Sequence, residues 1–487
     1  MTQASPAPAA APFAPAPDNS AANLSFAQLP LAPATLANLQ QLGYLQMTPI
    51  QAASLPPALA GQDLIAQAKT GSGKTAAFAL SLLAKLNPRR FAVQALVLCP
   101  TRELADQVTQ EIRRLARGED NIKVLTLCGG STMRPQISSL EHGAHVVVGT
   151  PGRIMDHLQR ETLDLSALDT LVLDEADRML DMGFYDDISF VAKACPKARQ
   201  TLLFSATYPE GIAKLSQAFL RQPQRITLPE QHEAGKIRQR FYEVDSDQKL
   251  AAVGLLLKHY RPVSTLAFCN TRQQCRDLLQ ILRAEGFVAL ALHGELEQRE
   301  RDQVLVQFAN RSCSVLVATD VAARGLDIDQ LEAVINVDVT PDTEVHVHRI
   351  GRTGRVDQAG WAFSLVSGNQ MTRVDNIEKA LGHEIEWHLL SELLVASGQR
   401  QPPLLPPMAT LQILGGRKEK IRPGDVLGAL TGDAGFSKEQ IGKINVTDTS
   451  TYVAVERSIA RDALRKLSAG TLKGKRVKVH MLQDRAG

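Results

Sequence analysis

The stretch LIAQAKTGSGKT, residues 64–75, decides how the first part of the chain folds. An apolar run leads into a glycine-rich loop, and a helical pattern follows the loop. Glycines allow backbone N–H groups to curl around phosphate oxygens, so this order predicts a nucleotide-binding loop rather than an ordinary turn with a surface lysine. The usual first glycine is replaced by Ala68, and the remaining positions fit. The predicted nucleotide contacts are Lys69, Thr70, Gly71, Ser72, Gly73, Lys74 and Thr75, with Lys74 on the β- and γ-phosphates and the Thr75 hydroxyl on Mg²⁺.

Short apolar runs alternate with helical patterns on both sides of this loop. The runs are rich in Val, Leu and Ile without polar alternation, as in strands of a parallel sheet that is covered on both faces. The predicted strands near the loop are Ala95–Cys99, His145–Val148, Thr170–Leu173 and Thr201–Phe204. The pattern then repeats, with runs at Thr265–Phe268, Val288–Leu292, Ser314–Ala318 and Glu332–Val337. We therefore predict two tandem α/β domains, over residues 23–228 and 237–390.

A third domain is predicted over residues 408–487, after a proline-rich linker at 391–407. Its pattern is β-α-β-β-α-β, the order of a ferredoxin-like, RRM-type α+β fold. The predicted strands are Thr410–Leu414, Lys443–Val446, Tyr452–Val455 and Arg476–Met481, and the helices are Pro423–Leu430 and Ser458–Leu467. From Pro407 onward, 15 Lys and Arg stand against 8 Asp and Glu, a net charge of +7 in a chain whose total is +3. Such a basic domain predicts polyanion binding.

The remaining composition is that of a globular protein, 44% hydrophobic and 22% charged. No apolar run reaches about 18 residues, so we expect no transmembrane helix and no membrane partner. The Ala- and Pro-rich residues 1–22 predict a disordered leader. The six cysteines show no CxxC pairing, so we expect buried thiols in a reducing cytoplasm instead of a zinc site.

Carboxylates follow the predicted strand Thr170–Leu173, in the order Asp174-Glu175-Ala176-Asp177. The carboxyl ends of parallel strands are where α/β sheets bind ligands. We expect Asp174 to hold Mg²⁺, largely through water, and Glu175 to orient or deprotonate the attacking water. The alternative is an acidic helix start. A phosphate loop in the same domain favours the catalytic interpretation.

Together these residues resemble the DEAD-box family of ATP-dependent RNA helicases, over nearly the whole span from Phe26 to about Arg355. Residues 43–51 look like the family's adenine-reading Q motif. The resemblance implies that the Gln51 amide pairs with adenine and that Phe26 stacks on it. It also implies two RecA-like domains, ATP and Mg²⁺ as cofactors, and RNA as the partner. DNA is not expected, although the motifs as read do not exclude it.

Both domains contain residues that resemble the family's RNA-backbone motifs. Threonine hydroxyls, arginines and exposed N–H groups suit phosphate and sugar contacts, although each motif alone could be ordinary turn chemistry. The implied RNA contacts are Thr101, Arg102, Gly130, Thr150, Gly152, Arg153, Thr271, Thr319 and Arg324. The segment Ser205-Ala206-Thr207 resembles the family's coupling motif, whose Ser205 and Thr207 are expected to hydrogen-bond near Asp177; a helix cap is the alternative.

The second domain is also expected to supply groups for ATP. The resemblance implies that Asp327 approaches the ribose. Arginines 349, 352 and 355 would share one face if their segment were helical, and Arg352 and Arg355 look like arginine fingers for the γ-phosphate. A solvated basic face is the alternative. His346 stands where the family often has tyrosine. Since both domains carry groups for both ligands, domain closure is expected to couple ATP and RNA binding.

The third domain resembles the tail of the bacterial DEAD-box protein A subfamily, on residues 416–432, 441–444 and 473–476. Members of this subfamily grip a 23S rRNA hairpin during assembly of the large ribosomal subunit. Only Tyr452 is aromatic on the predicted strands, so RNA contact is expected to depend on basic side chains. These are Arg417, Lys418, Lys420, Arg422, Lys473, Lys475 and Arg476, with a solubilising basic surface as the alternative.

The sequence therefore predicts a monomeric, cytoplasmic ATP-dependent RNA helicase that hydrolyses ATP to remodel 23S rRNA. Two alternatives stay open. One is a general RNA helicase without rRNA specificity, and the other is an ATP-gated RNA clamp with little turnover.

Overall fold

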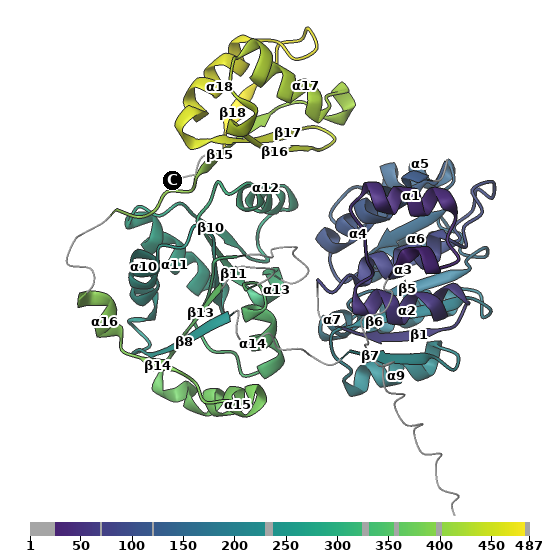
Figure 1. Ribbon diagram of the computed structural model, residues 1–487, viewed down its shortest axis with the longest axis horizontal. Coiled ribbons are helices and arrows are strands. Elements are labelled where there is room, and N and C mark those ends of the chain that lie inside the picture. The colour runs from purple at the N-terminus through teal and green to yellow at the C-terminus, as the bar shows by residue number, and fades with distance from the viewer. Residues whose placement is uncertain are drawn as a thin grey trace, which may run out of the picture. The chain divides into compact units, whose positions relative to one another are not determined.

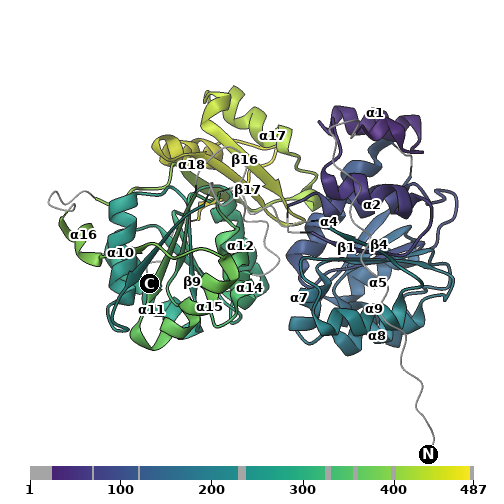
Figure 2. The same ribbon diagram turned by 60° about the horizontal axis from the view of Figure 1, so that its bottom comes forward.

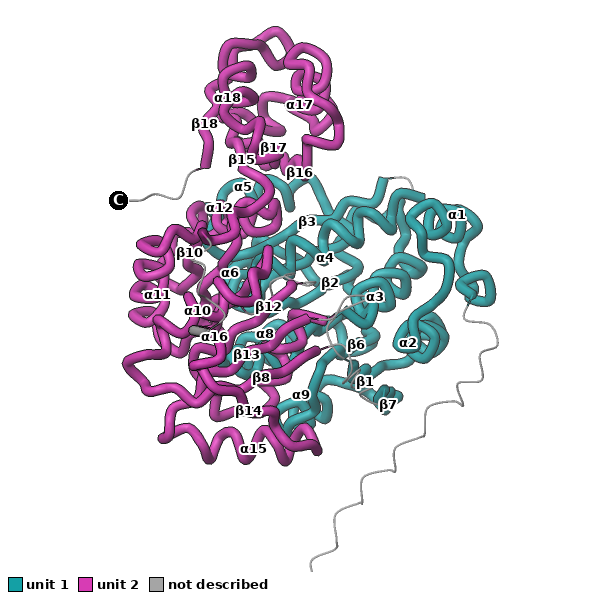
Figure 3. The backbone as a smooth tube through the Cα atoms, turned by 60° about the vertical axis from the view of Figure 1, so that its left-hand side comes forward, with its two compact units in different colours: residues 1–232 teal, residues 233–487 magenta. Residues whose placement is uncertain are grey.

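The computed structural model describes residues 25–68, 71–118, 121–228, 237–323, 331–354, 360–395 and 402–482. The chain divides into two compact units, Met1–His232 and Glu233–Gly487, which Figure 3 colours separately. The predicted leader over 1–22 lies outside the described residues, as do residues 396–401 of the predicted linker. Within the described ranges, no helix is long and apolar enough to cross a bilayer.

The first unit is built on a seven-stranded parallel sheet in the order β3-β4-β2-β5-β6-β1-β7. In chain order the strands are β1 Leu64–Gln67, β2 Ala95–Leu98, β3 Val124–Leu127, β4 Val146–Gly149, β5 Thr170–Leu173, β6 Gln200–Ser205 and β7 Gln224–Thr227. The helices are α1 Pro33–Gln41, α2 Pro49–Leu59, α3 Lys74–Leu83, α4 Arg102–Leu115, α5 Met133–Glu141, α6 Pro151–Gln159, α7 Ala176–Asp181, α8 Tyr185–Ala194 and α9 Glu210–Phe219.

Both faces of this sheet are covered, which explains why its central strands show no polar alternation. Successive residues of β1 point into different cores, with Leu64 and Ala66 in one and Ile65 in the other. The first core also contains side chains of α1 to α4, and the second contains those of α6 to α9. Figure 2 shows α1 and α2 on one side of the sheet and α8 and α9 on the other.

The second unit contains another seven-stranded parallel sheet, in the order β10-β11-β9-β12-β13-β8-β14. Its strands are β8 Ile237–Glu243, β9 Thr265–Cys269, β10 Ala289–Leu292, β11 Val315–Thr319, β12 Ala333–Asn336, β13 Gly360–Val366 and β14 Trp387–His388. Its helices are α10 Lys249–Tyr260, α11 Arg272–Ala284, α12 Gln298–Ala309, α13 Asp320–Ala323, α14 Thr343–Ile350, α15 Met371–Leu381 and α16 Leu390–Val395.

The end of the chain forms a four-stranded antiparallel sheet in the order β16-β17-β15-β18, the strand arrangement of an RRM-type fold. Its elements are β15 Met408–Ile413, α17 Pro423–Gly428, β16 Ile441–Val446, β17 Thr451–Glu456, α18 Ala460–Ala469 and β18 Val479–Met481. Figure 1 shows α17 and α18 on the same side of this sheet. Two parallel sheets followed by this antiparallel one confirm the predicted fold class.

Every strand that the sequence predicted is present within a few residues of its expected bounds. The sequence did not predict β3, β7, β8, β13 and β14. β8 is a clear case, because its first half carries Arg238, Gln239 and Arg240 and its side chains become fully buried only at Phe241 and Tyr242. A strand with so many charged residues lacks the apolar run from which the other strands were read.

Candidate active site and nucleic-acid interface

The phosphate loop curls through two glycines in the left-handed region, Gly71 at φ 79° and Gly73 at φ 95°. Gly73 is the N-cap of α3. A Cβ atom there would lie 2.5 Å from the Gln51 Nε2 atom, so both the backbone conformation and the space require glycine. The buried Lys74 ammonium donates to the Ala68 carbonyl at 2.7 Å. The predicted contact of Lys74 with the phosphates of ATP stays a prediction.

Gln51 is buried and joins the start of α2 to the phosphate loop. Its Nε2 donates to the Gly73 carbonyl at 3.1 Å, and its Oε1 accepts from the Thr48 N–H at 2.9 Å. The predicted adenine contact therefore also holds the loop. Phe26 packs edge-on against Tyr44, with ring centroids 6.2 Å apart, and is 4% exposed. Adenine pairing by Gln51 and stacking by Phe26 stay predictions.

The carboxylates after β5 are held in a buried cluster. Burial raises the pKa of Asp174 to about 7, although the Lys74 charge opposes the shift. Asp174 accepts a hydrogen bond from the Glu175 N–H at 3.0 Å. A buried carboxyl with this pKa can exchange its proton for a cation, so Asp174 fits the predicted magnesium role. Magnesium, when bound, would neutralise charge on the phosphates.

Glu175 has an unusual backbone, with φ 50° and ψ 51°, and is the N-cap of α7. An ion pair fixes its side chain, since the Arg178 Nη1 lies 3.2 Å from the Glu175 Oε2 and each side chain is 7% exposed. The left-handed backbone of a non-glycine residue is strained, and such strain is often found at functional sites. Arg178 was not among the predicted site residues.

Asp177 connects the end of β5 to the segment after β6, as expected. Its Oδ2 accepts from the Ala206 N–H at 3.1 Å, and from the Thr207 N–H and hydroxyl at 2.9 and 3.0 Å. The Ser205 hydroxyl accepts from the Asp177 N–H at 3.3 Å. Burial raises the pKa of Asp177, but the Thr207 hydrogen bonds and the Lys74 charge outweigh it and hold that pKa below its usual value.

The predicted RNA contacts of the first domain follow the carboxyl ends of its strands. The Arg102 guanidinium lies against Gly130, where a Cβ atom would be 1.6 Å from the Arg102 Nη1. Gly130 also has φ 76°, so both the backbone conformation and the lack of space for a Cβ atom require glycine at this position. Thr101 caps α4, and its hydroxyl accepts from the Leu104 N–H at 3.3 Å. Thr101 therefore has a structural role as a helix cap, and its RNA contact stays a prediction.

Arg153 is held by the loop around Ser131. Its guanidinium donates to the Ser131 carbonyl at 3.2 Å and to the Gln136 Oε1 at 3.0 Å. The buried His157 contacts the same Gln136 oxygen at 2.9 Å. Thr150 precedes α6 as its N-cap, and a Cβ atom on Gly152 would lie 3.3 Å from the Asp187 Oδ2. The contacts of Arg153 and His157 thus join α6 to the segment around Ser131 and Gln136.

In the second domain, Arg349 and Arg352 do not belong to one helix, so the condition for a shared helical face is not met. α14 ends at Ile350, and Gly351 is its C-cap. Only Arg349 belongs to the helix, while Arg352 follows it and is buried. Glycines at 351 and 354 break the helical pattern. Of the predicted residues, Lys69, Thr70, Arg324, Asp327 and Arg355 lie outside the described residues.

Arg349 is central to this domain, although the sequence alone indicates no role for it. Its side chain is 2% exposed and pairs with Asp320, which follows Thr319 at the end of β11. It also donates to Asn270 Oδ1 at 3.4 Å, just before the predicted contact Thr271, which is the N-cap of α11. The regular spacing of three arginines was the only signal for it in the sequence.

In the third domain, two basic loops meet. The Lys473 ammonium donates to the Lys420 carbonyl at 2.6 Å and pairs with Asp425 at 3.1 Å. This contact joins the segment after β15 to the segment before β18. The predicted basic residues on both loops are exposed: Arg417, Lys418, Lys420, Arg422, Lys473, Lys475 and Arg476. Tyr452 is only 5% exposed, which leaves it little surface for stacking on a base.

Comparisons with known proteins match all three domains. Family profiles match residues 48–215 ("DEAD/DEAH box helicase"), 248–357 ("Helicase conserved C-terminal domain") and 410–481 ("DbpA RNA binding domain"). The chain is 52% identical over 454 residues to the ATP-dependent RNA helicase DbpA of Escherichia coli, covering 93% of this chain and 98% of that protein. The chain belongs to the DEAD-box family of ATP-dependent RNA helicases, in its DbpA subfamily.

Other DEAD-box helicases are similar over the two parallel-sheet domains. CshA of Geobacillus kaustophilus is 40% identical over 363 residues, which cover 74% of this chain and 78% of that protein. The solved structure of Saccharomyces cerevisiae Dbp5 bound to RNA and ADP BeF3 matches with a TM-score of 0.70 at 30% identity, covering 77% of this chain and 99% of that one. These similarities confirm the RecA-like fold of both domains and the ATP-dependent RNA helicase activity.

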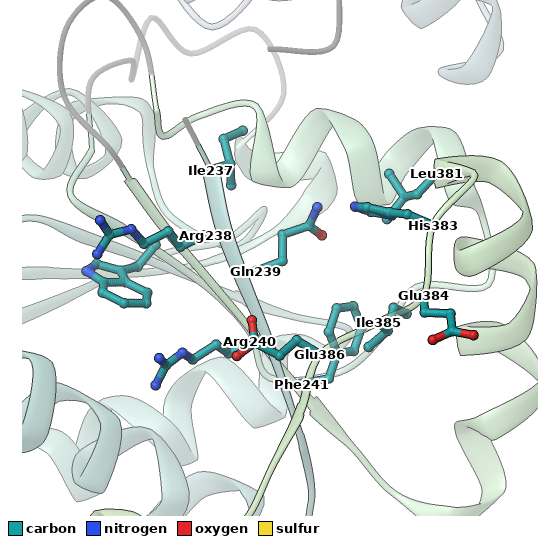
Figure 4. Close-up of a pocket in the computed structure, with 11 residues that line it drawn as sticks. Ile237, Arg238, Gln239, Arg240, Phe241, Leu381, His383, Glu384, Ile385 and Glu386 are labelled. Atoms are coloured by element: carbon teal, nitrogen blue, oxygen red, sulfur yellow. The ribbon is translucent and has the colours of Figure 1, made fainter. Parts of the chain in front are cut away.

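The helicase also has a cavity of about 440 Å³ beside the first half of β8. Figure 4 shows Gln239 of β8 directed towards His383, which follows α15. None of the residues that line this cavity is a predicted ATP or RNA contact. The cavity lies near the amino end of β8, whereas the predicted contacts follow the carboxyl ends of the strands. It is therefore separate from the candidate site.

Proposed function

We propose that this helicase uses Mg²⁺-ATP to remodel 23S rRNA duplexes during assembly of the large ribosomal subunit, as a monomer in the cytoplasm. The contact between the two basic loops at Lys473 is the observation that supports 23S rRNA as the target. It supports one basic surface in the domain that resembles the tail of the rRNA-specific subfamily. The six cysteines, all free and buried, are in keeping with a reducing compartment.

Within the proposed ATPase site, each predicted residue has one task. Lys74 would exchange the Ala68 carbonyl for phosphate oxygens, and Thr75 and Asp174 would hold Mg²⁺, largely through water. Glu175, fixed by Arg178, would orient the attacking water and accept its proton. Arg352, with Arg355, would stabilise charge on the γ-phosphate, a task that contributes about 10³–10⁵ in rate in related phosphoryl-transfer enzymes.

The proposed RNA contacts explain why ATP and RNA affect each other. Both RecA-like domains carry predicted ATP contacts and predicted RNA contacts. Binding of either ligand should therefore raise the affinity for the other by the same factor. In the first domain, Asp177 ties Thr207 to the carboxylates that serve ATP, which supports the proposed coupling role of Asp177, Ser205 and Thr207. Backbone contacts carry no sequence information, so specificity is assigned to the third domain.

The test compares ATP turnover with no RNA, bulk RNA, DNA and a 23S rRNA fragment. A triple variant, Lys473→Glu with Lys475→Glu and Arg476→Glu, should lose the preference for the fragment and keep stimulation by bulk RNA. The control is Lys438→Glu with Arg461→Glu, two charge reversals at exposed residues of the same domain outside the two basic loops. Affinity for the fragment should fall with salt at a slope of about −0.7 per phosphate contact.

Each outcome of this test separates the proposal from its alternatives. Equal stimulation by every RNA, unchanged by the triple variant, would leave a general RNA helicase without an rRNA address. Equal stimulation by DNA and RNA would contradict the choice of RNA. Binding of ATP and RNA without turnover would favour the ATP-gated clamp.

A further inference from the structure

Four residues of the second domain close a ring of hydrogen bonds. The Arg349 Nη2 donates to the Asn270 Oδ1 at 3.4 Å, and the Asn270 N–H donates to the Gln274 Oε1 at 3.1 Å. The Gln274 Nε2 donates to the Asp338 Oδ2 at 2.6 Å, and the Arg349 Nη1 returns to the Asp338 carbonyl at 2.8 Å. The ring joins the start of α11 to the buried arginine of α14.

Two members of this ring, Gln274 and Arg349, each contact a residue that is proposed to bind a ligand. On the RNA side, the Thr271 hydroxyl accepts from the Gln274 N–H at 3.1 Å, so Gln274 fixes the turn through both its backbone and its side chain. On the ATP side, the Arg352 N–H donates to the Arg349 carbonyl at 3.3 Å. A short, continuous path therefore runs from Thr271 to Arg352.

Asp338 makes a firm anchor for this path. Its Oδ1 accepts from the Lys249 ammonium at 2.8 Å and from the Gln370 Nε2 at 3.1 Å. Lys249 and Gln370 are both buried and contact each other at 2.6 Å. Because Asp338 keeps these partners without Gln274, replacing Gln274 should remove the bridge and leave the anchor folded.

We propose that Gln274 is a positioning residue that couples RNA contact at Thr271 to the placement of Arg349 and Arg352. This inference rests on the proposed roles of Thr271 and Arg352. A glutamine amide is suited to the task because it donates through nitrogen and accepts through oxygen at the same time. Leucine would make neither hydrogen bond. Lysine could donate to Asp338 but could not accept from Asn270.

The neighbouring Gln273 offers a matched control on the same helix. It is exposed, and its amide contacts only Asp277 and Arg276 of α11, at 2.7 and 2.8 Å, among its described hydrogen bonds. Gln273→Leu therefore makes the same chemical change without touching the ring.

The experiment measures RNA affinity with and without a non-hydrolysable ATP analogue in the full-length chain. For Gln274→Leu, the factor by which the analogue tightens RNA binding should fall by about 2- to 30-fold. The affinity for the analogue without RNA should stay at the wild-type value, as should domain stability in urea. Gln274→Lys should fall between leucine and wild type, and Gln273→Leu should match wild type.

Three results would overturn the inference. Gln274→Leu could keep the wild-type coupling factor, or lose it only together with domain stability, which would indicate a merely structural role. A lysine variant equal to wild type would remove Asn270 from the path. If the wild-type chain itself shows no coupling between ATP and RNA, the proposed function fails instead.

Discussion

The guanidinium of Arg349 forms a bidentate ion pair with the carboxylate of Asp320. Its Nε lies 2.7 Å from the Asp320 Oδ1, and its Nη2 lies 2.6 Å from the Oδ2. The arginine is 2% exposed and also lies over the Phe268 ring at 5.0 Å. The pair ties the end of β11 to α14, so it orders the segment that carries Thr319 and the helix that leads to Arg352.

Arg349→Met should destabilise the second domain by about 3–5 kcal/mol, because it leaves the Asp320 charge without its buried partner. Arg349→Lys keeps the charge but not the paired geometry, so its loss should be smaller. Both tryptophans of the chain, Trp361 and Trp387, lie on strands of this domain, so their fluorescence during urea unfolding reports on it selectively. Equal losses for the two variants would contradict the importance of the charge.

Gly130→Ala should weaken RNA binding by roughly 10- to 100-fold, the effect of losing a hydrogen bond to a charged group. The added methyl group would occupy the space of the Arg102 guanidinium. Gly183→Ala is the control, because Gly183 has a similar φ of 80° with no atom within 4 Å of its Cβ position. Anisotropy of a labelled RNA measures both affinities. If both variants lose the same affinity, backbone strain alone is responsible.

Glu175→Gln should lower steady-state turnover by about 10²–10⁴-fold, the usual contribution of a general base. Glutamine keeps the shape of the side chain, so ATP binding should persist. Phosphate release under saturating RNA gives the rate, and a fluorescent ATP analogue gives the affinity. Wild-type turnover in this variant would show that another group activates the water.

Binding of Mg²⁺-ATP should release a proton from Asp174 near neutral pH. Without a cation, burial raises the pKa of this carboxyl from 3.8 to about 7, so the folded chain holds a proton that the unfolded chain lacks over that range. The Asp174 contribution to stability therefore falls as pH rises, while Mg²⁺-ATP affinity increases towards a plateau above pH 7. Calorimetry in buffers of different ionisation heat measures the proton, and Asp174→Asn should abolish it.

The second domain should lose stability as pH falls from 6.5 to 4. Burial lowers the pKa of His346 from 6.5 to about 4, with the Arg349 charge adding to the effect, so over this range the unfolded chain binds a proton that the folded one excludes. This group alone should cost on the order of 3 kcal/mol at the acidic end. His346→Phe should flatten the wild-type pH dependence measured by tryptophan fluorescence. An unchanged slope would place the sensitivity elsewhere.

Much of the fold could be predicted, because strands buried on both faces leave continuous apolar runs. β8 could not, since its first half carries Arg238 and Arg240, which lie over the Trp361 ring at 5.3 and 5.1 Å, and apolar burial begins only at Phe241. These two arginines break the pattern from which strands are inferred, although the strand pairs along its whole length with β13.

Motifs adjacent in sequence could be predicted at the site, whereas partners brought together by the fold could not. The spacing from Asp174 to Asp177 indicated carboxylate chemistry. Nothing in the sequence indicates that Gln274 contacts Asp338, which follows a different strand. Nor does it indicate that the Arg102 side chain lies against Gly130. The sequence left open whether the arginines share a helix. Arg349 and Arg352 do not, because α14 ends at Ile350 and Gly351 is its C-cap.

The burial of Tyr452 has a consequence for how this enzyme can change. In the proposed function, RNA recognition by the third domain falls to the basic residues of two loops, which are exposed and lie outside the hydrophobic core. Substitutions of these exposed side chains, Lys473 apart, should cost little folding free energy, so a new RNA target can evolve, or be engineered, by changing them while the buried Ile421 and Leu472 hold the loops in place. The ATPase activity of the two RecA-like domains and the RNA target of the third domain can thus change independently.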